Sequence, residues 1–354
     1  MLENNKLYEI EPYSLKDKEK MIIFKKVIND LTNHHYLNSR NYQKLLKFLN
    51  YDRKKVSRLE ETPFLPVKLF KDFNLKSVKN NEVIKILHSS GTTGNQPSKI
   101  YLDKTNANAQ SKVLNIIIQT ILGKERMPML IIDKSPKNLN RTTLNARMAA
   151  INGFSIFGKY HTYLLDENGK IDYKNLNLFL SKYSSKKFFI FGFTSIVYEN
   201  LVKKLSKKHF KLNFNNGLLI HGGGWKKMES IKISNKIFKD QLNKKIGLEN
   251  IYNYYGLVEQ TGSIFIECKC GYFITSIFSD ILIRDRNFNI LKNGSRGFIQ
   301  LFSSLPTSYP GHSILTEDVG EIVERHNCKC SMHGKRFLVH GRIKNAEIRG
   351  CSDV

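Results

Sequence analysis

The pattern of apolar and polar positions along the chain predicts helices and strands in turn. Over 14–50, apolar residues recur at helical spacing, as at Ile23, Val27 and Leu31, and Ser14 is the predicted N-cap. Strand-like runs follow at 83–88, 128–132, 187–192, 217–221 and 249–255. Further helix-like runs are 105–122, 141–150, 194–205 and 226–241. This alternation predicts an α/β fold with a mainly parallel sheet covered by helices.

The pattern changes after about residue 262, where the apolar runs become short. The short strand-like runs are 264–266, 281–283, 298–302 and 337–339. They predict a smaller β-rich lobe after the α/β part. We therefore expect three parts: an N-terminal helical segment over 1–75, an α/β core over 76–262 and the β-rich lobe over 263–354.

Composition narrows the class of protein. Hydrophobic residues make up 41% of the 354, with 22 Phe and 16 Tyr, which is ample for a large core. No run reaches the ~18 apolar residues of a membrane span, and the polar N-terminus lacks a signal-peptide core. Five cysteines in a chain of this length do not indicate a secreted disulfide scaffold. We expect a soluble cytoplasmic protein without a membrane span.

The chain is strongly basic, with 57 Lys+Arg against 31 Asp+Glu and a formal net charge of +26. Such a charge can attract polyanions such as nucleic acid or acidic membrane. However, the lysines are spread along the chain, and they accompany many Asn, Ile and Tyr residues, the bias of an AT-rich genome. Compositional drift therefore explains the charge better than nucleic-acid binding.

A hydroxyl-rich glycine loop follows the apolar run 83–87. Its polar and glycine residues are Ser90, Gly91, Thr92, Thr93 and Gly94, and Lys99 follows. Glycines allow a tight turn whose N–H groups approach an anion, so the loop suits nucleotide phosphates. It is not a Walker A loop, because the Gly-Lys-Ser/Thr ending is missing. An ordinary Ser/Thr/Gly turn is the alternative interpretation.

Four further motifs follow later in the chain, two of them at predicted strand ends. A strand ending in Gly222, Gly223 and Gly224 leaves room for a flat ring, although a glycine-rich turn explains the triplet equally well. The later motifs contribute Tyr255 and Gly256, Glu259, Asp318 and Arg342. A tyrosine can stack on a base, glutamate can hold Mg²⁺, aspartate can accept ribose hydroxyls and arginine can bind anions bidentately.

The order of these motifs resembles the acyl-adenylate-forming superfamily, whose relatives include the phenylacetate-CoA ligases. Within it, the chain most resembles the acyl-protein synthetase subunit of the bacterial luminescence fatty-acid reductase. That similarity rests on Pro63–Phe70, Phe191–Thr194 and the ending Gly341–Cys351. One departure is Val258, where the superfamily has a threonine hydroxyl in the phosphate site.

The resemblance implies that ATP and a carboxylic acid give acyl-AMP and pyrophosphate. It implies that Gly91–Gly94 and Lys99 hold the β- and γ-phosphates. Gly222–Gly224 and Tyr255 would then frame the adenine, Glu259 would hold Mg²⁺, Asp318 the ribose and Arg342 a ribose or phosphate oxygen. The resemblance suggests a fatty acid as substrate, although an amino or aromatic acid fits the motifs as well.

Superfamily ligases continue past the Gly-Arg motif into a mobile lid domain that carries a catalytic lysine. This sequence ends twelve residues after Arg342, at Val354, so we expect no such lid. The resembling family instead has an acyl-accepting cysteine near its C-terminus, and Cys351 matches that position. Arg349 beside it favours the reactive thiolate. The expected sequence is acyl-AMP, a thioester on Cys351 and delivery to a partner reductase or carrier protein.

The other cysteines form two Cys-x-Cys pairs. They are Cys268, Cys270, Cys328 and Cys330. Four thiolates can close a tetrahedral zinc site that joins two loops of the β-rich lobe, with His326 or His333 as substitute ligands. Four free thiols are the alternative.

Two other functions stay open at this point. One is a phenylacetate-type acyl-CoA ligase, which the missing lid disfavours. The other, from a different class, is a basic polyanion-binding module without catalysis. Pyrophosphate release from ATP with a panel of carboxylic acids separates the module from the enzymes.

Overall fold

The computed structural model describes residues 6–52, 58–89, 97–135, 146–206, 213–225, 233–324 and 328–342. The helices are α1 Asp17–Asn38, α2 Arg40–Phe48, α3 Leu69–Asp72, α4 Lys104–Leu122, α5 Ala146–Ser155, α6 Tyr173–Tyr183, α7 Thr194–Val197 and α8 Asn235–Ile246, with a π-helix η4 Tyr198–Lys204 and the 3₁₀ turns η1 Lys6–Glu9, η2 Leu59–Glu61, η3 Asn80–Glu82 and η7 Val258–Gln260. The strands are β1 Leu65–Pro66, β2 Lys85–His88, β3 Lys99–Leu102, β4 Met127–Lys134, β5 Gly158–Leu165, β6 Phe188–Phe193, β7 Gly217–Gly222, β8 Asn250–Tyr255, β9 Phe265–Glu267, β10 Phe273–Ile274, β11 Ser279–Arg284, β12 Gly297–Ser303, β13 Ser313–Val323 and β14 Arg336–Arg342.

The chain divides into two compact units. Among the described residues, the first unit combines the chain up to Ile118 with the segment from Gly256 to Arg342, and the second spans Gln119–Tyr255. A unit built from two segments that are far apart in the sequence cannot be recognised from the order of the elements along the chain. The three-part division with boundaries at residues 75 and 262 stays a prediction.

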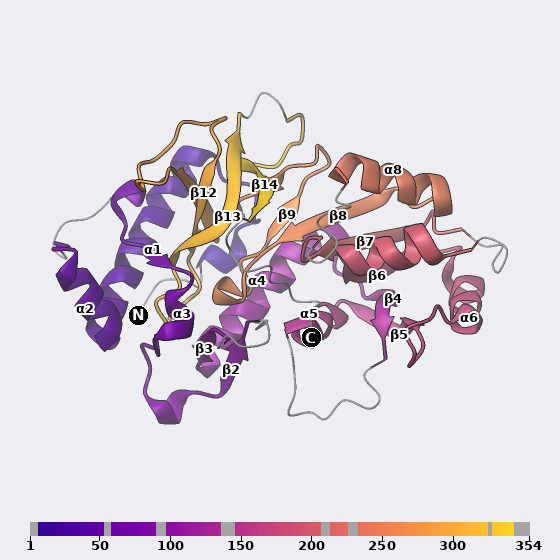
Figure 1. Ribbon diagram of the computed structural model, residues 1–354, viewed down its shortest axis with the longest axis horizontal. Helices are drawn as coiled ribbons and strands as arrows, with labels where there is room; N and C mark the ends of the chain where they lie inside the picture. Colours follow the sequence, from indigo (N-terminus) through magenta and orange to yellow (C-terminus); the bar gives the residue numbers. More distant parts are fainter. Residues whose placement is uncertain are drawn as a thin grey trace. The chain divides into compact units, whose positions relative to one another are not determined.

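The second unit is a parallel α/β layer structure, as the alternating pattern predicts. Its strands lie in the order β5-β4-β6-β7-β8, and each neighbouring pair is parallel. The central strand β6 is buried along its whole length. On one face, Phe188 and Ile190 pack with side chains of α6, η4 and α8. On the other face, Phe191 stacks on Phe154 of α5, with ring centroids 4.3 Å apart. Helices therefore cover both faces of this part of the sheet (Figure 1), and this part of the α/β prediction is confirmed.

The first unit contains the β-rich part of the chain. Strands β11-β12-β13-β14-β10-β9 pair in that order, and the pairs β11–β12, β12–β13, β13–β14, β14–β10 and β10–β9 are all antiparallel. The short strand β1 joins β13 in parallel. Helix α1 is fixed to β11 by Lys20, whose ammonium lies 3.1 Å from the Asp280 carboxylate.

The prediction of helix over 14–50 is confirmed, but the segment forms two helices, because the chain takes an extended conformation at Ser39. Two other local predictions are wrong. The N-cap of α1 is Lys16 rather than Ser14, whose hydroxyl donates to the Glu11 carbonyl instead. The run 83–88 yields β2, which pairs with β3 in a separate antiparallel hairpin rather than joining the parallel sheet.

Candidate active site

Asp318 and Arg342 form an ion pair near the C-terminal end of β14. They are register partners on β13 and β14, and Arg342 Nε lies 3.3 Å from Asp318 Oδ1. The Asp318 N–H donates to the Thr316 hydroxyl at 3.1 Å, and that hydroxyl donates to the Ile299 carbonyl at 2.9 Å. These bonds fix the part of β13 that carries the Asp318 carboxylate, where the pairing with β12 is irregular.

Glu259 lies in the 3₁₀ turn η7 and is 5% exposed. The turn is held in place by the Tyr309 hydroxyl, which donates to the Glu259 carbonyl at 2.9 Å. Gln260 next to it donates to the Gly311 carbonyl at 2.8 Å. Burial raises the pKa of the Glu259 carboxyl, while a hydrogen bond with Ser98 and the charge of Arg342 act in the opposite direction. A buried carboxylate of this kind is a hard oxygen ligand suited to Mg²⁺.

The residues predicted to bind phosphate, Ser90–Gly94, lie outside the described residues. Ser89 before this segment and Ser98 after it are hydrogen bonded to each other: the Ser98 N–H donates to Ser89 Oγ at 2.9 Å, and the Ser89 N–H to the Ser98 carbonyl at 3.3 Å. Lys99 follows as the first residue of β3. Since Ser98 also bonds to Glu259, the base of the predicted phosphate loop lies beside the predicted Mg²⁺ ligand.

In the second unit, the predicted adenine-binding glycines lie at the end of β7, whose last residue is Gly222. A Cβ on Gly222 would lie 2.4 Å from the ring of Tyr254, so only glycine allows this close approach. Gly223 and Gly224 have φ angles of +79° and +67°, and the space around Gly224 is open. Tyr255 ends the neighbouring parallel strand β8. The triplet therefore turns sharply at the carboxyl end of a parallel strand, where ligands bind in open α/β sheets.

Thr194, the last residue of the Phe191–Thr194 motif, supports this turn. Its hydroxyl lies 3.0 Å from the Gly222 carbonyl, which can only accept, and 2.9 Å from His221 Nδ1. The single hydroxyl proton therefore goes to the carbonyl, and His221 donates from Nδ1. Burial lowers the pKa of His221 to about 3, so the imidazole stays neutral. No role was predicted for Thr194 or His221, and the motif that contains Thr194 is the signal that could have identified one.

Val258, where the superfamily has threonine, packs against an apolar cluster that includes Phe70, Tyr309 and Ile314. These apolar surroundings explain why a valine side chain is accommodated at this position. Tyr309 and Ser98, which position Glu259, were not predicted because their contacts join segments far apart in the sequence.

The cysteine pairs come together in the first unit. The sulfur atoms of Cys268 and Cys328 lie 3.6 Å apart, and those of Cys328 and Cys330 lie 3.2 Å apart. Cys270 is exposed, two residues from Cys268 on the same turn, and its side chain also contributes a hydrogen bond to Cys328. All four are free thiols.

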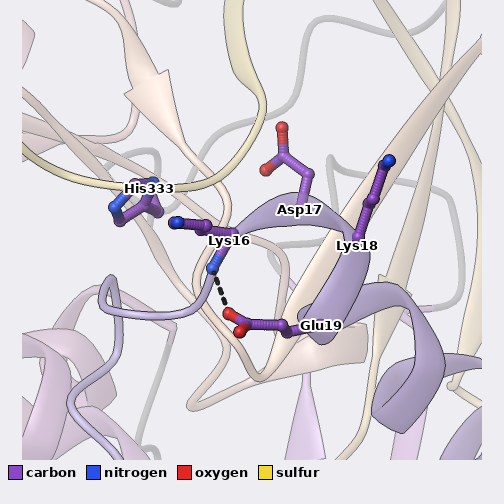
Figure 2. Close-up of a pocket in the computed structure, with 5 residues that line it drawn as sticks. All are labelled: Lys16, Asp17, Lys18, Glu19 and His333. Atoms are coloured by element: carbon purple, nitrogen blue, oxygen red, sulfur yellow. Dashed lines mark hydrogen bonds between the residues drawn. The ribbon is translucent and has the colours of Figure 1, made fainter.

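Of the two histidines proposed as substitute zinc ligands, only His333 is among the described residues. His333 lines a pocket at the start of α1 together with Lys16, Asp17, Lys18 and Glu19 (Figure 2). There the Lys16 N–H donates to the Glu19 carboxylate at 3.1 Å. The candidate metal group of the described residues consists of Cys268, Cys328 and Cys330 without a histidine. His326 lies outside the described residues, as does Cys351.

The fold is shared with ligases that hold acyl-adenylates. An open conformation of 2-hydroxyisobutyryl-CoA ligase in complex with 2-HIB-AMP and CoA is 13% identical, with a TM-score of 0.71 over 94% of this chain and 77% of that one. The same ligase in its postadenylation state with 2-HIB-AMP gives a TM-score of 0.72 at 13% identity, covering 94% and 69% of the two chains. No curated protein matches the chain in sequence. The architecture is thus that of an adenylate-forming ligase.

The chain belongs to the acyl-protein synthetase family, LuxE, whose model matches residues 3–354. It is therefore an adenylating ligase that activates a carboxylic acid with ATP. Among the described residues, no helix is both long and apolar enough to cross a membrane.

Proposed function

We propose that the protein activates a fatty acid as acyl-AMP, transfers the acyl group to its own Cys351 and delivers it to a partner reductase or carrier protein. The observation that carries the adenylation site is the convergence of Glu259, Ser98, Asp318 and Arg342 within one unit. Their chemistry fits a nucleotide with a divalent cation: two carboxylates, a guanidinium and the base of a hydroxyl-rich glycine loop.

In this proposal the chain's residues bind and orient the reactants. Asp318 accepts hydrogen bonds from the ribose hydroxyls, and Arg342 contacts a ribose or phosphate oxygen. Ser90–Gly94 and Lys99 hold the β- and γ-phosphates, and Gly222–Gly224 with Tyr255 and Gly256 frame the adenine. Mg²⁺, held by Glu259, neutralises phosphate charge when bound. Catalysis of the first step is then mainly stabilisation of negative charge in the transition state.

The second step is an acyl transfer. The Cys351 thiolate attacks the carbonyl carbon of acyl-AMP, the C–S bond forms, and the bond between that carbon and the phosphate oxygen breaks. AMP leaves with the electron pair, and the thiol proton passes to solvent. The thioester keeps the acyl group reactive for transfer to the partner.

A labelling experiment tests the proposal. The protein is incubated with labelled long-chain fatty acid, ATP and Mg²⁺, and both pyrophosphate and protein-bound label are measured. We expect acid-dependent pyrophosphate and a label that hydroxylamine removes, as it removes a thioester. Cys351→Ser should lose the label and keep pyrophosphate release, because activation precedes transfer. The neighbouring variant Ser352→Ala is the matched control and should keep both.

Three outcomes contradict parts of the proposal. Hydroxylamine-sensitive label on Cys351→Ser makes another cysteine the acceptor. Pyrophosphate release from wild-type protein without label means that the acceptor lies wholly on a partner, or on coenzyme A if its addition yields acyl-CoA. A panel of fatty, aromatic and amino acids that releases no pyrophosphate above background contradicts the proposed adenylation site.

A further inference from the structure

The four paired cysteines lie on two turns that the sheet brings together. Cys268 and Cys270 are in the connection from β9 to β10, and Cys328 and Cys330 are in the connection from β13 to β14. Strand β10 pairs with both β9 and β14, so residues about 60 positions apart become neighbours. This convergence depends only on the first unit, and it is independent of the nucleotide-site residues.

The sulfur positions fit metal coordination and do not fit a disulfide. The sulfur atoms of Cys268, Cys328 and Cys330 lie within 4.8 Å of one another, and the two closest pairs are 3.6 and 3.2 Å apart. A disulfide needs about 2.05 Å. Ligands about 2.3 Å from a tetrahedral zinc ion are about 3.8 Å from each other. Cys270 lies outside this group of three, but it is on the same turn as Cys268 and in side-chain contact with Cys328, so it is the candidate for the fourth ligand.

Arg336 gives a second, independent indication of negative charge at these sulfurs. Its side chain is 1% exposed, and its described partners include the carbonyls of Gly334 and Met332, the Cys330 sulfur at 3.5 Å and the Cys328 side chain. Its Nε has no hydrogen-bond partner among the described residues. A buried guanidinium without an anion is costly. Zinc with four thiolates carries a net charge of minus two, which would balance this cation.

The surroundings of the cluster match a structural metal site. Cys268 and Cys328 are 2% and 8% exposed, and they pack with Tyr13 and Ile274 in one apolar cluster. Arg342 lies six residues along β14 from Arg336, about 20 Å in an extended strand, so the cluster is separate from the proposed nucleotide site. Four protein ligands close the coordination sphere and leave no position for a reacting water.

We propose that Cys268, Cys270, Cys328 and Cys330 bind one structural zinc ion, which joins the β9–β10 turn to the β13–β14 connection. The ion fixes the end of the hairpin opposite to Asp318 and Arg342. Its removal should therefore loosen the sheet that carries these residues without removing any group that contacts the nucleotide.

Elemental analysis of the full-length protein, purified without chelators, is expected to find about one zinc per chain. Cys328→Ser should lose at least about tenfold in zinc content, because three remaining sulfur ligands hold the ion far less well. Cys351→Ser, outside the two pairs, is the matched control and should retain the zinc. Cobalt in place of zinc should give the visible absorption bands of a tetrahedral thiolate site.

A measurement on the wild-type protein keeps the proposal testable if the cysteine variants fail to fold. Titration with a mercurial reagent should release the zinc as about four thiols react, followed with a zinc-sensitive dye. Chelator-treated, zinc-free protein should melt at a lower temperature. Protein that contains no zinc, or iron in its place, overturns the proposal. Zinc-free protein with an unchanged melting temperature overturns the structural role.

Discussion

Asp318 and Arg342 face each other across β13 and β14, with Arg342 Nε 3.3 Å from Asp318 Oδ1. The pair places a carboxylate and a guanidinium side by side, with a backbone irregularity in the ladder between Val319 and Gly320. The arginine neutralises part of the carboxylate charge and orients its oxygens. In the proposed nucleotide site, this carboxylate accepts hydrogen bonds from two adjacent ribose hydroxyls.

We expect Asp318→Asn to raise the KM for ATP about 10- to 100-fold, because a hydrogen bond to a charged group contributes about 1.5–3 kcal/mol. Initial rates of pyrophosphate release at varied ATP concentration measure this change. Glu321→Gln, on the same strand, is the control, because it removes an ion pair to Arg296, which is 66% exposed. Such exposed pairs contribute little. An unchanged KM in Asp318→Asn would show that the carboxylate does not bind ATP.

The sequence predicted the elements whose pattern is strong and missed those whose pattern is weak. The buried parallel strand β6 reads as a continuous apolar run and was predicted almost to the residue. Strand β5, in contrast, runs Gly-Lys-Tyr-His-Thr-Tyr at its start and exposes three of those residues, so neither its composition nor its alternation identified it. Strand β13 was missed because Thr316, Glu317 and Asp318 interrupt its apolar residues, although most of the strand is buried.

The candidate site shows the same limit. The individual residues Glu259, Asp318 and Arg342 could be proposed from motifs, because each motif is local. The contacts that position them could not, since Ser98 reaches Glu259, and Tyr309 reaches the Glu259 carbonyl, only after distant segments pack. Arg336, the buried cation beside the cysteines, was missed for a related reason: an arginine at the start of a strand gives no sign of burial in the sequence.

The glycine turn after β7 can be tested with a pair of matched glycines. Gly224 has φ +67° and Gly123 has φ +77°, and a Cβ on either would meet nothing within 4 Å. Alanine therefore introduces the same left-handed backbone strain at both, about 1 kcal/mol of stability. If Gly224 borders the adenine, Gly224→Ala alone should raise the KM for ATP, because its methyl group takes up space in the proposed site.

The measurement is the KM for ATP of both variants beside their melting temperatures. Equal loss of stability with a raised KM only in Gly224→Ala supports the adenine assignment. Equal KM values in the two variants would mean that the glycine triplet serves the turn and not the nucleotide.

Glu259→Gln tests the proposed Mg²⁺ ligand. The amide keeps the size of the side chain and removes its negative charge, so Mg²⁺ binding weakens and acid-dependent pyrophosphate release should fall about 10²-fold. The Mg²⁺ concentration for half-maximal rate should rise as well. Glu267→Gln is the matched control, because Glu267 is also buried in the first unit, at 1% exposure, on strand β9.

Glu259→Gln and Glu267→Gln are compared both in reaction rate and in stability. Both glutamine variants are expected to lose some stability, and only Glu259→Gln is expected to change the Mg²⁺ dependence. A Glu259→Gln enzyme with the wild-type rate and Mg²⁺ requirement would move the metal ligand to another residue.

The ion pair between α1 and β11 predicts how stability depends on pH. Lys20 Nζ lies 3.1 Å and Lys335 Nζ 2.8 Å from the carboxylate of Asp280, which is 2% exposed. Burial raises the pKa of the Asp280 carboxyl, but the charges of Lys20 and Lys335 outweigh it and lower the pKa to about 2, from an ordinary value of 3.8. Between these values the unfolded state binds more protons than the folded state, so stability rises with pH.

The contribution of Asp280, roughly 2 kcal/mol, is therefore fully present above pH 4–5 and is lost as the pH falls through 3.8 toward about 2. Urea unfolding at a series of pH values from 3 to 7 measures it. Asp280→Asn should lower the free energy of unfolding by about 3–5 kcal/mol at neutral pH, because it leaves two lysines facing a neutral amide. The free energy of unfolding of this variant should also fall less steeply as the pH decreases. Arg58→Ala, which removes an exposed ion pair with Glu61, should lower the free energy of unfolding by less than about 1 kcal/mol and leave its decrease at acid pH unchanged. If the free energy of unfolding falls equally steeply at acid pH in Asp280→Asn, the pH dependence comes from other carboxylates.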